Sequence, residues 1–278
     1  ARSLAELGQR TFVVPRPHPT LVTRRVLVME RLDGFRFDDV TGMRAAGVDT
    51  GAVVRAGMIA FLEGCMLKGV FHGDLHGGNL FVRPDGRTAL LDYGITARMS
   101  EAERHAFLRL LLGASMNDPR LQLMALRDLG TLPPDTDIDA VARDLGVDQP
   151  PVDPTTLTPE QLTAEIQRVV KRLLAYGARL PKVLMLFVKN LVFLDGAIAT
   201  LAPDLDLFAE IAHISTYFAT QWGPAIAGEL GFDQADYRMD LDGIKSGFGV
   251  DPGTTQTLTY RDLQRRRELI RSRMKGEL

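Results

Sequence analysis

The sequence predicts a mixed α/β fold that is mostly helical, and two kinds of pattern indicate it. Residues 80–82 and 88–91 are short apolar runs on either side of the turn signal Pro84-Asp85-Gly86, which predicts a β-hairpin. From Gly51 to Lys68 apolar residues recur at the spacing of one helical face. Further helices are expected at residues 101–112, 119–129, 138–146, 159–176, 180–201, 204–222 and 259–275.

Signals at both ends of the chain complete the expected order of elements. Residues 1–11 resemble the end of a helix, and the continuous apolar run within residues 24–30 predicts a strand covered on both faces. Ser100 and Glu103 form a capping box that opens a helix soon after the hairpin. Residues 180–201 are strongly apolar and are expected to form a buried central helix.

Composition bounds the class of protein. The chain has 278 residues, 45% of them hydrophobic, which is enough for one good-sized core. Its net charge of −2, without a basic aromatic stripe, argues against a nucleic-acid partner. The single cysteine, Cys65, cannot form an internal disulfide and is expected to be buried in a reducing compartment. Without a signal peptide or an unbroken apolar run of about 18 residues, we expect a soluble, cytoplasmic chain.

Polar side chains gather around the predicted hairpin. Asn79 enters the first strand and Asp92 leaves the second, so the two should meet at the open end of the hairpin. A carboxylate and a carboxamide together suit a hard cation such as Mg²⁺, which completes its shell with phosphate oxygens and water. Asp74 lies one loop earlier, where it could orient or deprotonate an attacking hydroxyl or water.

A second interpretation of the same stretch involves a transition metal. His72, Asp74 and His76 alternate, so on an extended backbone they would share a face and could bind such an ion. This alternative leaves Asn79 and Asp92 without a role. We interpret His72 instead as a structural residue that orders the loop.

The stretch resembles a known family. H-G-D-L-H-G-G-N followed by L-L-D-Y-G is similar to the catalytic loop and the metal-binding Asp-Phe-Gly of the protein-kinase-like superfamily. More narrowly it resembles the ABC1/UbiB (AarF/ADCK, COQ8-like) atypical kinases, whose loop usually reads H-x-D-x-H-P-G-N. Gly77 replaces the usual proline and Tyr93 the usual phenylalanine. Neither departure removes a chemical group.

The resemblance implies a role for each polar residue. Asp74 would be the catalytic carboxylate, and His76 would lie near the transferred phosphate. Asn79 and Asp92 would bind Mg²⁺ and, through it, the ATP phosphates. The fold implied is a protein-kinase-like α/β (α+β) fold.

The segment V-L-V-M-E before Arg31 resembles the hinge between the two lobes of a kinase. By this resemblance Met29 would lie behind the adenine, and the backbones of Glu30 and Leu32 would bind its edge. The phosphate-covering loop, the strand lysine and the K-x-G-Q segment of this family do not occur before Glu30. With Ala1 rather than methionine at the start, we expect mostly the helical C-lobe, with the last N-lobe strands and the hinge. The expected parts are residues 1–32, 33–222 and a C-terminal extension, 223–278.

The function implied is an ATP- and Mg²⁺-dependent atypical kinase or ATPase, in isoprenoid-quinone (ubiquinone or menaquinone) biosynthesis or lipid homeostasis. Few residues separate Gly94 from the next helix, which favours a small-molecule acceptor or ATP hydrolysis over peptide substrates. An aminoglycoside- or choline-kinase-like phosphotransferase and a non-catalytic, pseudokinase-like scaffold are the alternatives. The arginines of residues 265–273 could meet anionic lipid at a membrane surface, although a solvated face explains them as well.

Overall fold

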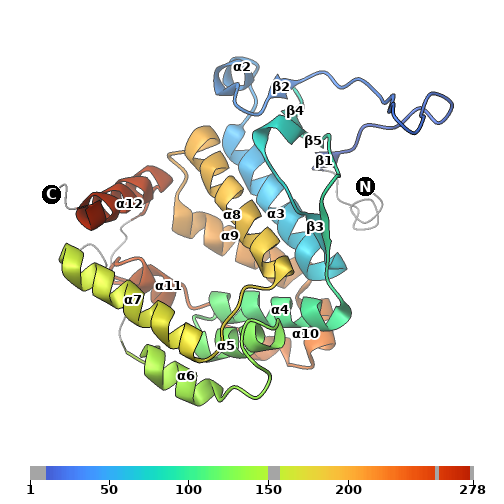
Figure 1. The fold of residues 1–278 in the computed structure, drawn as a ribbon. Coiled ribbons are helices and arrows are strands. Elements are labelled where there is room, and N and C mark those ends of the chain that lie inside the picture. Colours follow the sequence, from blue (N-terminus) through green and yellow to red (C-terminus); the bar gives the residue numbers. More distant parts are fainter. Residues whose placement is uncertain (1–10, 150–156, 254–256, 276–278) are drawn as a thin grey trace. The chain divides into compact units, whose positions relative to one another are not determined.

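The computed structural model describes residues 11–149, 157–253 and 257–275 (Figure 1). These residues form two compact units. The first contains residues 11–99 and 186–203, and the second contains residues 100–185 and 204–275. The predicted N-terminal helix falls almost entirely outside the described residues, and the expected boundaries after residues 32 and 222 stay a prediction.

The first unit combines short strands with long helices. Its elements are β1 (Phe12–Val13), β2 (Phe35–Arg36), α2 (Val40–Ala45), α3 (Thr50–Lys68), β3 (Val70–His72), the 3-10 turn η1 (Gly77–Asn79), β4 (Leu80–Val82), β5 (Thr88–Leu90), β6 (Thr96–Arg98) and most of α8 (Lys182–Leu201). The predicted hairpin is confirmed as β4 and β5. The helix predicted at residues 51–68 is confirmed as α3, which begins one residue earlier.

Two small sheets surround the hairpin. The four-stranded sheet has the order β1-β5-β4-β2, in which β1 runs parallel to β5 and the other neighbours are antiparallel. β3 and β6 form a separate antiparallel pair, with His72 opposite Thr96. The β3–β6 pair connects the segment before the loop of Asp74 to the segment after the hairpin.

The core of the first unit joins α3, β3 and α8. Phe61 of α3 stacks on Phe187 of α8 with ring centroids 5.5 Å apart, and Phe71 of β3 meets both rings edge-on. Thr50, at the other end of α3, donates to the Leu201 carbonyl of α8 at 2.6 Å, so the two helices run antiparallel. Figure 1 shows them side by side. Contacts at both ends therefore fix α8 against the helix that precedes the loop of Asp74.

The predicted burial of Cys65 is confirmed. Its side chain is fully buried in α3, and burial raises the pKa of the thiol well above its usual value. The thiol therefore stays protonated and behaves as a small apolar side chain.

The predicted strand at residues 24–30 is wrong. Within the described residues this segment makes an isolated bridge, from Met29 to Pro17, and Val26 and Leu27 are 55% and 58% exposed. The segment opposite contains Pro15, Pro17 and Pro19, which lack the N–H groups that a strand ladder requires. An apolar run predicts a covered strand only where neighbours exist to cover it.

Two helices, α3 and α8, are long and apolar enough to cross a membrane by length and composition. We expected no such segment, because no apolar run is unbroken over about 18 residues. Both helices contain charged residues, yet their mean hydropathy is high enough to meet the criterion. α3 is half buried within the protein, as expected of a core helix. α8 is less covered than predicted, because one face carries the buried Phe187 and Leu201 while Val192 on another is 68% exposed.

Within its described residues, the regular elements of the second unit are helices, apart from an isolated bridge between Asp206 and Thr259. Its helices are α4 (Glu101–Ser115), α5 (Pro119–Asp128), α6 (Ile138–Leu145), α7 (Pro159–Ala175), α9 (Leu207–Gln221), α10 (Gly223–Leu230), the 3-10 turn η3 (Gln234–Asp236), α11 (Leu241–Gly247) and α12 (Tyr260–Lys275). The capping box of Ser100 and Glu103 is confirmed at α4, and Thr158 with Gln161 forms a second one at α7.

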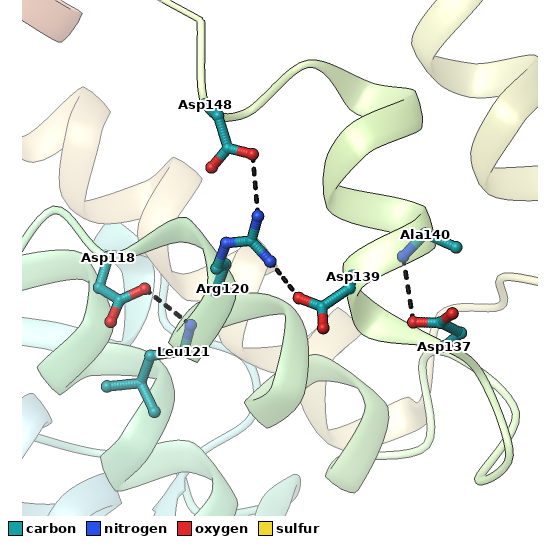
Figure 2. Close-up of polar contacts among 7 residues, drawn as sticks. All are labelled: Asp118, Arg120, Leu121, Asp137, Asp139, Ala140 and Asp148. Carbon is teal, nitrogen blue, oxygen red and sulfur yellow. Dashed lines mark hydrogen bonds and ion pairs between the residues drawn. The ribbon is translucent and has the colours of Figure 1, made fainter.

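Charged and apolar contacts hold α5 and α6 together. Figure 2 shows Arg120 of α5 between Asp139 of α6 and Asp148, which it binds at 2.9 Å. Asp118 and Asp137 cap the two helices by accepting bonds from backbone N–H groups. Beneath these polar contacts lies a buried apolar cluster of Leu123, Leu132, Ile138, Val141 and Ala142.

Candidate functional site

The path from α3 into the loop that carries Asp74 depends on one close approach. A Cβ atom at Gly64 would lie 2.7 Å from the backbone carbonyl oxygen of Val70, a contact that side chains do not make. Because residue 64 is glycine, β3 can pack tightly on the last turns of α3. The loop that carries Asp74 therefore begins at a fixed point on the core.

The hairpin brings Asn79 and Asp92 to the same end, as predicted. Leu80 pairs with Leu90, and one step further the Leu91 N–H donates to the Asn79 carbonyl at 2.9 Å. The Asn79 side chain is nearly buried, and its Nδ2 donates to the Asp74 carbonyl at 3.3 Å. A direct hydrogen bond thus joins Asn79 to Asp74. Asp92 directly follows Leu91, whose backbone is bonded to that of Asn79.

His72 links the two halves of the site. Its Nδ1 accepts the Asp74 N–H at 3.0 Å, so that nitrogen carries no proton. The assigned neutral tautomer then has its proton on Nε2, which donates to the Asp92 carbonyl at 2.6 Å. Both ring nitrogens are thereby occupied by backbone groups, which supports the structural interpretation of His72.

These contacts argue against the transition-metal alternative. His72 has no ring nitrogen left for a metal, and no three His, Cys, Asp or Glu side chains gather as a metal site in the part of the chain that the structure describes. His76, the other histidine of that alternative, is exposed.

The donor set suits a hard cation. With Nδ2 of Asn79 donating to the loop, its Oδ1 is the atom left for a ligand. Asp92 is exposed, and its Oδ1 accepts the Gly94 N–H at 2.7 Å, which orients the carboxylate. One neutral oxygen and one charged oxygen match what Mg²⁺ takes from a protein that binds nucleotide phosphates.

Two residues of α8 also contact this loop, and we did not predict them from the sequence. Lys189 Nζ lies 2.6 Å from Oδ1 of Asp74, and this hydrogen bond holds the pKa of Asp74 below its usual value. Asn190 is fully buried, accepts the Leu75 N–H at 3.0 Å and donates to the His72 carbonyl. Its amide therefore holds the backbone on both sides of Asp74. A polar Lys-Asn pair inside an otherwise apolar helix was the available signal.

The hinge-like segment lies beside the hairpin. A Cβ atom at Gly34 would lie 2.5 Å from the Val82 carbonyl oxygen, so only glycine allows β2 to approach β4 there. Within the described residues no hydrogen bond joins Met29, Glu30 or Leu32 to the hairpin, and their contacts with adenine stay a prediction.

Gly77 and Gly78 of this loop lie in the 3-10 turn η1. Gly77 and Gly78 have no positive φ angle, and a Cβ at Gly77 would make ordinary contacts with Phe37. Gly78 is tighter, with the His76 ring 3.1 Å from the Cβ position. The backbone of this turn therefore does not require glycine at residue 77, because a 3-10 turn is open to any residue.

Tyr93 carries a buried hydroxyl without a hydrogen-bond partner in the described structure, and burial raises the pKa of this phenol well above its usual value. We expect Tyr93→Phe to increase the free energy of unfolding by about 1 kcal/mol, because it removes an unpaired polar group. Urea denaturation would measure this. Tyr176→Phe is the matched control and should lower stability slightly, since its hydroxyl donates to Asp144 at 2.6 Å. A loss of stability in Tyr93→Phe would contradict the expectation.

A loop carboxylate, an asparagine and a second aspartate at the end of a hairpin, on a mostly helical frame, form the arrangement that the resemblance to kinases predicts. The model of the ABC1 atypical kinase-like domain matches residues 2–123, which include all the predicted site residues. This match confirms the resemblance to the ABC1 family and the predicted kinase-like α/β fold, and it indicates an atypical kinase-like protein.

The comparisons also find similar proteins and a solved structure. The uncharacterized protein MT0675 of Mycobacterium tuberculosis is 31% identical over 74% of this chain and 42% of its own length. ACTIVITY OF BC1 COMPLEX KINASE 1, a chloroplast protein of Arabidopsis thaliana, is 28% identical over 79% of this chain and 32% of its own. The chain thus spans less than half the length of these relatives. The solved structure of Rv3197 of M. tuberculosis with erythromycin has a TM-score of 0.35 at 19% identity, covering 73% of this chain and 56% of that one.

Proposed function

We propose that the chain carries the catalytic loop and metal-binding segment of an ATP- and Mg²⁺-dependent atypical kinase or ATPase. The observation that supports this most strongly is the connected set around Asp74. The Asn79 side chain bonds to its carbonyl at 3.3 Å, and His72 ties its N–H to the Asp92 carbonyl. Carboxylates and an amide held this way match the parts that phosphoryl transfer requires.

Each residue has a distinct task in this proposal. Asn79 and Asp92 would hold Mg²⁺, which neutralises charge on the phosphates when bound. Asp74 would orient the attacking hydroxyl and receive its proton, and His76 would lie near the transferred group. Met29, Glu30 and Leu32 would contact the adenine.

The acceptor is proposed to be a small molecule or water. β6 pairs with β3 directly after the Asp-Tyr-Gly segment, and α4 begins at Glu101. That leaves no long segment of the kind with which protein kinases hold peptides. We place the function in isoprenoid-quinone biosynthesis or lipid homeostasis, with contact at a membrane surface, in keeping with the ABC1 match. That match also favours this function over an aminoglycoside- or choline-kinase-like one.

The test is Mg²⁺-dependent ATP turnover by the full-length protein. We expect Asp74→Asn to lower kcat by at least about 100-fold while the affinity for Mg·ATP changes little, because the carboxylate acts on the acceptor rather than on the nucleotide. The rate of ADP formation would measure kcat, and titration with a fluorescent ATP analogue would measure the affinity. A wild-type protein that binds no nucleotide, or an Asp74→Asn variant with normal turnover, would contradict the proposal.

A further inference from the structure

Lys189 presents an ammonium group at the carboxylate of the catalytic loop. Its Nζ lies 2.6 Å from Asp74 Oδ1, although 115 residues separate the two in sequence. Before Asp74 the sequence contains a single lysine, Lys68, which is the last residue of α3. Lys189 is thus a lysine that α8 brings to the loop.

The pair is a weak source of stability. The Lys189 side chain is 53% exposed and that of Asp74 is 34% exposed. Ion pairs so open to water contribute little to folding, because water solvates both charges when they separate. A stabilising role therefore does not explain why this ammonium lies at the loop.

The position of the ammonium is nevertheless well fixed. The next residue, Asn190, is fully buried and holds the backbone of His72 and Leu75 on either side of the loop. Phe187, two residues before Lys189, stacks on Phe61 of α3. The backbone of Lys189 is therefore anchored, while the end of its side chain stays open to solvent. A side chain that binds a ligand needs both properties.

The chemistry of the proposed reaction needs a cation at this place. A phosphoryl group in transfer carries negative charge on its three equatorial oxygens, and it would lie beside the carboxylate of Asp74. Two anionic groups in contact repel each other unless a positive charge lies between them. A lysine ammonium, with three donors, can bind a carboxylate oxygen and a phosphoryl oxygen at once.

We propose that Lys189 is a phosphate-binding residue of the catalytic site, which bridges Asp74 and the terminal phosphoryl group of a bound nucleoside triphosphate. This inference rests on the proposed function. In the reaction the acceptor oxygen bonds to the terminal phosphorus while the bond from that phosphorus to the bridging oxygen breaks. The acceptor proton passes to the second carboxylate oxygen of Asp74, and the nucleoside diphosphate leaves with the bonding electron pair. Lys189 keeps its proton throughout.

The experiment compares a triphosphate with a diphosphate. Lys189→Met, Lys189→Arg and wild type would be prepared as full-length proteins, with binding of Mg·ATPγS and Mg·ADP measured by calorimetry and ATP turnover measured separately. We expect Lys189→Met to weaken Mg·ATPγS binding about 10-fold, to leave Mg·ADP binding within about twofold, and to lower kcat about 100-fold. Lys189→Arg should recover part of the loss, because it restores the charge.

Lys182→Met is the matched control. Lys182 is exposed in the first turn of the same helix, so this variant should match wild type in all three measurements. The midpoint of thermal unfolding should be the same in all variants. A Lys189→Met variant that binds and turns over like wild type, or that loses both nucleotides equally together with stability, overturns the role of Lys189 alone. Wild-type protein that binds neither nucleotide overturns the proposed function and this inference together.

Discussion

Asp92→Asn is expected to weaken binding of Mg·ATP to the full-length protein by at least about 100-fold, which is about 2.7 kcal/mol of binding free energy. The substitution keeps the size of the side chain and one carbonyl oxygen but removes its negative charge. Since Asn79 is neutral, Asp92 supplies the formal charge that the two proposed ligands offer to Mg²⁺. Calorimetric titration with and without Mg²⁺ would measure the loss.

Asp85→Asn is the control for this experiment. Asp85 lies in the turn at the opposite end of the same hairpin, where it accepts hydrogen bonds from Arg87. The same chemical change at this exposed ion pair should leave Mg·ATP affinity unchanged. If Asp92→Asn bound Mg·ATP as well as wild type, Asp92 would not be a metal ligand and the nucleotide site would have to lie elsewhere.

Asn190→Ala is expected to lower the free energy of unfolding by about 2–4 kcal/mol. The amide of Asn190 is fully buried and satisfies the Leu75 N–H and the His72 carbonyl. Alanine leaves both backbone groups without a partner, and a buried unpaired group costs far more than an average hydrogen bond contributes. Denaturant titration followed by circular dichroism would measure the change.

The matched control lies two residues further along α8. Val192 is 68% exposed, so Val192→Ala should change the free energy of unfolding by less than about 0.5 kcal/mol. If Asn190→Ala stayed within about 1 kcal/mol of wild type, the loop would be held by contacts other than this amide. Activity should fall in Asn190→Ala even at temperatures where the variant is folded, because the backbone on both sides of Asp74 would be released.

Local features were predicted well. Two apolar runs and a Pro-Asp-Gly turn predict the hairpin. Capping boxes mark the starts of the helices at residues 101 and 159. Each of these signals is contained in a short stretch of sequence. Such signals need no knowledge of the rest of the fold. For the same reason the predicted convergence of Asn79 with the residues at the end of β5 is confirmed.

Features that depend on distant neighbours were predicted poorly. The apolar run within residues 24–30 predicted a covered strand, yet the prolines opposite it cannot complete a ladder. The amphipathic exposure of α8 was missed, because an apolar sequence does not indicate which side of a helix has a partner.

The sequence by itself determined the order Asp74, Asn79, Asp92 and the hairpin that brings the second and third together, because residues joined by a short turn have to meet. Only the tertiary structure decided that Lys189 and Asn190 reach the same loop. Their approach depends on α8 packing on α3 through Phe187 and Phe61, in which residues more than a hundred positions apart share one core. Burial of apolar surface between distant segments drives that packing, and no local pattern records which segments will be paired.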